Sequence, residues 1–280
     1  MKRQIKLKSY KLTIYEIALY GILLTIYLIA AFLEKRVFRG AANISITYAV
    51  FIIFGLALGP WRAAFLGILC DTINQLIHGI GQWMIEYAII PMVIGFISGW
   101  FIRLLNKKQK DIWISGFVLL MIVFAVFIFI LVKYKNEIPM NEFSKSRKKK
   151  WPVDLALGIG ITGLLMVFIT SSILFIINIK TRNFKRRWSV TLLFGIIITV
   201  LTILIITRWF WGPFAFINYY NRFRNGNWPY HPNFFYIMVP IIFKSLIEIP
   251  AYSIFIFAIY PVIILIRKKI NFYTNKLHTY

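Results

Sequence analysis

The chain has 280 residues and a formal net charge of +24, with 60% hydrophobic, 18% aromatic and only 15% charged residues. A soluble domain is nearer half apolar and about a quarter charged, so this composition excludes an ordinary soluble protein. Apolar runs long enough to cross a membrane recur along the whole chain, which indicates a polytopic, all-α membrane bundle. Most lysines and arginines lie between those runs, where basic residues set topology and meet anionic headgroups. The charge therefore does not indicate nucleic-acid binding.

Eight apolar segments are predicted to cross the membrane as helices. They cover residues 12–32, 46–58, 61–77, 83–105, 112–132, 153–179, 189–207 and 234–266. With the amino terminus inside, this count places both termini in the cytoplasm beside basic segments, as the positive-inside rule expects. The basic segment 133–151 then falls outside, against that rule. Either the rule is broken locally, or one of the two neighbouring segments does not cross.

The segment 46–100 carries the most informative pattern. Two apolar runs meet at Gly59-Pro60, and proline lacks an amide donor and disfavours helix in the preceding residue, so a helix break is predicted there. The second run carries four polar residues at spacings of three or four, which places them on one helical face: Asp71, Asn74, Gln75 and His78. A carboxylate inside a membrane faces protein or a water-filled cavity, so this face is a candidate binding element.

Later segments add polar groups and packing signals. Gly95 and Gly99, four apart in the fourth span, indicate close helix packing. Residues 208–233 are interpreted as the most polar and aromatic loop of the chain. In the last span Lys244 and Glu248 lie four apart on one helical face, where they are placed to pair.

The predicted topology directs a set of polar and aromatic residues toward one outer face. The candidate substrate-binding residues are Asp71, Asn74, Gln75, Gln82, Trp83, Glu86, Trp211, Arg222, Arg224 and Lys244. An aromatic pocket with a few polar groups suits a planar, polar small molecule. Two alternatives stay open at this point: the tryptophans form an interfacial aromatic belt, and the two arginines contact lipid headgroups.

These motifs resemble the substrate-binding subunit (S component) of energy-coupling factor (ECF) transporters. The resemblance rests on a span ending in Gly59-Pro60, the G-x-x-x-D pattern from Gly67 to Asp71, the Gly95/Gly99 helix, and a Lys/Arg…Pro pattern from Lys244 to Pro250. It implies a six-helix core with about two additional spans. Residues 10–105 would then hold the first four spans, 106–188 an inserted pair, and 189–280 the last two core spans of one membrane domain.

The resemblance also implies a function. Such a subunit captures a vitamin from outside, folate first and riboflavin second on this resemblance, and works in the cell membrane with a transmembrane scaffold and two cytoplasmic ATPases. Carboxylates of a folate-like ligand would meet Arg222, Arg224 or Lys244. Ala18, Gly21, Gly59 and Pro60 are the candidate docking residues.

An intramembrane enzyme acting on a lipid-like substrate is the alternative. Asp71, His78 and Glu86 would supply its acid–base chemistry.

No nucleotide-binding G-x-x-x-x-G-K-[ST] motif occurs in the sequence, so energy for transport would have to come from partners. The single cysteine, Cys70, offers neither a disulfide framework nor a metal-ligand cluster, and no cofactor is predicted.

Overall fold

The computed structural model describes residues 14–36, 45–79, 81, 83–105, 109–133, 153–224 and 226–276. In these residues the regular structure is helical and contains no strand, which confirms the predicted all-α bundle. The elements are α1 (Ile14–Arg36), α2 (Ile46–Leu58), α3 (Pro60–His78), α4 (Ile85–Leu105), α5 (Gln109–Lys133), α6 (Val153–Lys180), α7 (Phe184–Leu204), the π-helix η2 (Ile205–Phe210), α8 (Trp211–Phe223) and α9 (Tyr230–Lys276).

Five helical stretches of the described chain are long and apolar enough to cross a membrane. They are Ile14–Arg36, Gln109–Phe129, Gly160–Lys180, Phe184–Phe223 and Asn233–Ile270. The apolar helix α2 is shorter: its 13 residues extend about 20 Å, less than the ~30 Å hydrocarbon core. Nine of those residues are buried, so α2 is enclosed by other helices rather than by lipid.

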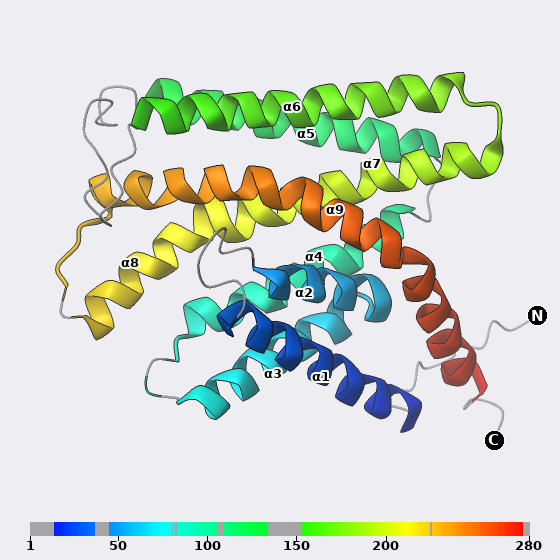
Figure 1. Cartoon of the computed structure of the whole chain (residues 1–280), viewed down its shortest axis with the longest axis horizontal. Helices are drawn as coiled ribbons and strands as arrows, with labels where there is room; N and C mark the ends of the chain where they lie inside the picture. Colours follow the sequence, from blue (N-terminus) through cyan, green and yellow to red (C-terminus); the bar gives the residue numbers. More distant parts are fainter. Residues whose placement is uncertain are drawn as a thin grey trace, which may run out of the picture.

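The helices form two groups joined by α7 and α9. Figure 1 shows α5 and α6 side by side along one flank, α1 to α4 on the other, and α7 and α9 running between them. α1 begins and α9 ends at the same end of the bundle. The other end, where α3 ends and α4 begins, is the outer one in the predicted topology and is called the outer end below.

Glycines let α2, α3 and α4 pack backbone to backbone. A Cβ on Gly55 would lie 2.5 Å from the Gly95 carbonyl oxygen, and one on Gly95 would lie 2.8 Å from the Ala63 carbonyl oxygen. The close packing predicted for the fourth span is therefore confirmed. Nearer the outer end, a Cβ on Gly67 would lie 2.7 Å from the carbonyl oxygen of Pro91. Since α3 and α4 are antiparallel, this register brings the last two turns of α3 level with the first turn of α4.

The predicted break at Gly59-Pro60 is also confirmed. Gly59 has a φ of 86°, a conformation that glycine adopts without the steric cost that a side chain would impose. Pro60 is the first residue of α3, where its missing amide hydrogen costs no helical hydrogen bond. The chain can therefore reverse between α2 and α3 with almost no loop.

The loop expected over 208–233 is wrong for about three quarters of its length, because residues 208–223 and 230–233 are helical. Helix runs on from α7 through η2 into α8, which ends at Phe223. The polar and aromatic residues that suggested a loop pack α8 against α9 instead: the Tyr230 hydroxyl donates to Asn218 Oδ1 at 2.6 Å, and the rings of Phe214 and Tyr230 stack at 5.9 Å. Pro213 lies directly after the π-helical turn η2, and it removes one hydrogen bond from the continuous helix without ending it.

Candidate substrate-binding site

Three buried polar atoms at the outer end have no hydrogen-bond partner among the described residues. They are Asp71 Oδ2 on α3, Trp83 Nε1 just before α4, and Glu86 Oε2 in the first turn of α4. The register of the α3–α4 pair brings this part of α3 level with the start of α4. An unsatisfied buried polar atom costs about 1–3 kcal/mol, so groups of this kind favour a ligand that supplies the missing partners.

Helix α8 joins this region through aromatic side chains. The indole Nε1 of Trp211 donates to the Glu86 carbonyl oxygen at 2.7 Å. The rings of Tyr87 and Tyr219 meet edge to face, with their centroids 6.2 Å apart. Two predicted site residues, Glu86 and Trp211, are thus in direct contact although 125 positions separate them in the sequence. The start of α4 therefore lies against an aromatic face of α8.

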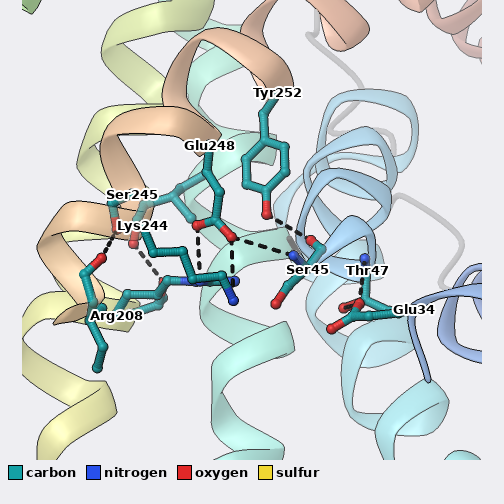
Figure 2. Close-up of polar contacts among 11 residues, drawn as sticks. Glu34, Ser45, Thr47, Arg208, Lys244, Ser245, Glu248 and Tyr252 are labelled. Atoms are coloured by element: carbon teal, nitrogen blue, oxygen red, sulfur yellow. Dashed lines mark hydrogen bonds and ion pairs between the residues drawn. The ribbon is translucent and has the colours of Figure 1, made fainter. Parts of the chain in front are cut away.

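A charged cluster lies between α2, η2 and α9. Figure 2 shows Glu248 of α9 facing both Arg208 and Lys244. Arg208 Nη1 lies 2.9 Å from Glu248 Oε2, and Lys244 Nζ lies 3.7 Å from Glu248 Oε1. The Glu248 side chain is fully buried and that of Arg208 is 9% exposed. The Arg208 guanidinium also lies over the Tyr48 ring, 4.1 Å from its centroid. The predicted pairing of Lys244 with Glu248 is confirmed.

The same cluster holds the beginning of α2. The Ser45 amide donates to Glu248 Oε1 at 3.4 Å, and the Tyr252 hydroxyl donates to the Ser45 carbonyl oxygen at 2.7 Å. Beside it, Thr47 donates its hydroxyl to Glu34 Oε2 at 2.9 Å (Figure 2), which ties the last turn of α1 to the first turn of α2. The amino-terminal end of α2 is therefore fixed by polar contacts from both α1 and α9.

Arg208 is the residue that the sequence analysis missed. Span seven was predicted to end at Thr207, so Arg208 was assigned to a loop. It lies instead inside the π-helix η2, a rare conformation found mostly as single turns and often at functional sites. One signal was available: an isolated arginine in a continuous apolar and aromatic stretch, which in a membrane segment indicates a functional site by default.

The other predicted site residues make none of the contacts described above. Asn74 is buried and Gln75 half-buried on α3. Arg222 and Arg224 are exposed at the end of α8, away from the buried cluster. Gln82 lies outside the described residues.

The candidate docking residues Ala18 and Gly21 are exposed on α1, and no other group lies within 4 Å of a Cβ built on Gly21. Near them Glu16, 1% exposed, pairs with Arg62 of α3 at 2.6 Å. Gly59 and Pro60 form the turn into α3. A role for these residues in docking stays a prediction.

One comparison with known proteins gives a match. Residues 11–146 match the family model described as ECF-type riboflavin transporter, S component. These residues make up just under half of the chain and are similar to the S components of ECF transporters. The recognition of an S component from the sequence is thereby confirmed, whereas its folate-type branch is not. No curated protein and no solved structure gives a significant match.

The matched family consists of vitamin-binding transporter subunits, which are not enzymes. The enzyme alternative gains no support. Of its three residues, Asp71 and Glu86 lie at the outer end, while the side chain of His78 is not among those described. Within the described part of the chain, no three His, Cys, Asp or Glu side chains are grouped so as to hold a metal ion.

Proposed function

We propose that this S component captures riboflavin at the outer end of the bundle and hands it to a transport module. The match of residues 11–146 to the riboflavin-type family carries this proposal. Folate, the first expectation from the sequence, becomes the second candidate. The polar and aromatic residues at the outer end support the choice in two ways.

The first support is the kind of polar group at the outer end. The isoalloxazine ring of riboflavin carries an imide, which presents an N–H donor between two carbonyl acceptors. Asp71 and Glu86 each have a buried carboxylate oxygen available to accept, and Trp83 has an indole N–H available to donate. The rings of Tyr87, Tyr219 and Trp211 lie beside them, and aromatic faces of this kind stack on a planar ligand.

The second support for riboflavin over folate is the state of the arginine and lysine side chains near the site. Folate carries two carboxylates, which call for uncommitted positive charge in the site. Arg208 and Lys244 both pair with Glu248, so their charge is partly compensated inside the protein. Arg222 and Arg224 are exposed at the end of α8. A largely neutral ring system fits this balance better than a dianion does.

The test is a binding titration of the full chain purified in detergent, which follows the fluorescence of riboflavin as it binds and uses folate as competitor. The variants D71N, E86Q and W83F each alter one of the three unpartnered groups. Since a hydrogen bond to a charged group contributes about 1.5–3 kcal/mol, each carboxylate variant should weaken riboflavin binding about tenfold or more. D111N, which alters an exposed acid near the opposite end of the bundle, is the matched control and should bind as the wild type does.

The outcomes distinguish an error in the identity of the ligand from an error in the location of its site. If folate binds tightly and riboflavin does not, the ligand assignment is wrong although capture of a vitamin stands. If riboflavin binds equally well to D71N, E86Q and W83F, the ligand lies elsewhere, and the Arg208–Glu248 cluster is the next place to examine.

We further propose that the chain works in the cell membrane, with both termini cytoplasmic, beside a transmembrane scaffold and two cytoplasmic ATPases. The exposed face of α1 around Ala18 and Gly21 supports this proposal, because small residues let a partner helix approach closely. The measurement is co-purification of the three partner subunits with the wild type and with A18W and G21W. Undiminished recovery with both variants would rule out docking at this face.

A further inference from the structure

An apolar cavity of about 560 Å³ lies between α4, α5 and α7, away from the outer end. Its wall includes Ile97 and Trp100 of α4, Ile112 and Leu119 of α5, and Phe194 and Ile198 of α7. These positions lie within about three turns of the end of α4 and the start of α5, so the cavity is at the depth of the inner leaflet in the predicted topology. The buried Phe194 belongs to its inner wall, whereas Trp100, 56% exposed, lies at its open side.

The cavity has a mostly apolar wall, and its hydroxyl donors are already used. Its three hydroxyl groups bond to carbonyls of their own helices: Ser115 donates to Ile112, Thr199 to Gly195 and Thr202 to Ile198, at 3.1, 2.9 and 2.8 Å. A volume of this size is typical of ligand sites, and a partly open apolar cavity at this depth suits a hydrocarbon chain.

Polar groups lie at the end of the cavity nearest the α4–α5 turn. Gln109, the first residue of α5, has a buried side-chain Nε2 with no hydrogen-bond partner among the described residues. Arg187 of α7 is exposed and lies on the same helical face as Phe194 and Ile198, seven and eleven residues further on. The Trp113 indole donates to Thr191 at 3.2 Å, which fixes the register of the two parallel helices and puts Gln109 level with Arg187.

We infer that this cavity is a binding site for an anionic phospholipid of the inner leaflet. One acyl chain lies between α4 and α5 against α7, and the lipid phosphate accepts from Gln109 Nε2 and Arg187. Lys110, exposed beside Gln109, adds positive charge at the same level. Basic groups between helices on the cytoplasmic side of a membrane protein commonly bind such headgroups, and the charge selects an anionic lipid over a zwitterionic one.

The test is native mass spectrometry of the purified full chain with added dioleoyl phosphatidylglycerol or dioleoyl phosphatidylcholine. The wild type should retain one phosphatidylglycerol and bind phosphatidylcholine about tenfold more weakly. L119W and T202F each fill the cavity and should lose the bound lipid, whereas V118F, at an exposed position on α5 outside the cavity wall, should keep it. R187Q and Q109L should weaken phosphatidylglycerol binding about tenfold, and R186Q, the exposed neighbour on another face, should not.

Equal retention of the two lipids, or full retention by L119W and T202F, would overturn the inference. So would a wild type that binds neither lipid. R187Q and Q109L leave the cavity wall intact, so they test the inference even if both filling variants fail to fold.

Discussion

The buried pair between Arg208 and Glu248 gives the sharpest prediction. In E248Q the amide keeps the size of the side chain but removes its negative charge. Arg208, with a side chain only 9% exposed and a guanidinium 2.9 Å from the carboxylate, then has a buried charge without a counter-charge. Removing one partner of a buried ion pair typically costs about 3–5 kcal/mol, and we expect a loss of free energy of unfolding in that range.

Lys244 supplies the matched control on the same carboxylate. It lies 3.7 Å from Glu248 Oε1, further than the 2.9 Å of Arg208, and its side chain is 26% exposed, so it is the weaker partner of the carboxylate. K244Q should therefore cost at most about 1 kcal/mol. The double variant R208M/E248L removes both charges and should recover most of the stability that E248Q loses, because neither remaining group is charged.

The assay is reversible unfolding of the purified protein in mixed detergent and SDS, followed by circular dichroism. The reasoning is refuted if E248Q loses no more stability than K244Q, or if R208M/E248L is less stable than E248Q. Either result would mean that water or lipid headgroups, rather than Glu248, balance the charge of Arg208.

Two further predictions concern other contacts. G95A should cost about 1–3 kcal/mol in the same unfolding assay, because its Cβ would lie 2.8 Å from the Ala63 carbonyl oxygen, whereas G21A on the exposed face of α1 should be neutral or slightly stabilising; equal effects would contradict the close packing of α3 and α4. W211F removes the 2.7 Å hydrogen bond to the Glu86 carbonyl oxygen and should cost about 1 kcal/mol and weaken riboflavin binding, and unchanged binding in the fluorescence titration would exclude Trp211 from the site.

Periodicity and chain chemistry were enough to predict the helices of the eight apolar segments, although not α8. Apart from Trp83 and Met84, which precede α4, the described residues of every predicted apolar segment are helical, because long apolar runs in a membrane have to satisfy their backbone internally. The break at Gly59-Pro60 and the close packing at Gly95 follow from what glycine and proline permit locally. The Lys244–Glu248 pair was predicted for the same reason, since residues four apart meet on one helix whatever surrounds it.

The charged cluster could not be predicted from local rules. Ser45 and Glu248 are 203 residues apart, and only the packing of α2 against α9 brings them together. The end assigned to span seven was wrong because the polar and aromatic residues from 208 onward suggested a loop, whereas a π-helical turn and a buried partner let Arg208 remain within the helix. The α8 helix was missed because its aromatic residues suggested an interface, yet they pack α8 against α4 and α9.

The outer end of the α2–α3–α4 unit is held by different contacts from the rest of the unit, and this difference bears on ligand capture. Through most of its length the unit is fixed by glycine contacts between backbones, which allow little movement without steric overlap. At its outer end α2 donates hydrogen bonds to Glu34 and Glu248 and accepts one from Tyr252, and a polar ligand can exchange these bonds for its own. A ligand that binds near Asp71 and Glu86 would therefore change the polar contacts at the outer end while the glycine-packed helices keep their arrangement. That division suits a subunit that has to recognise a small molecule outside and present the same helix faces to its partners throughout.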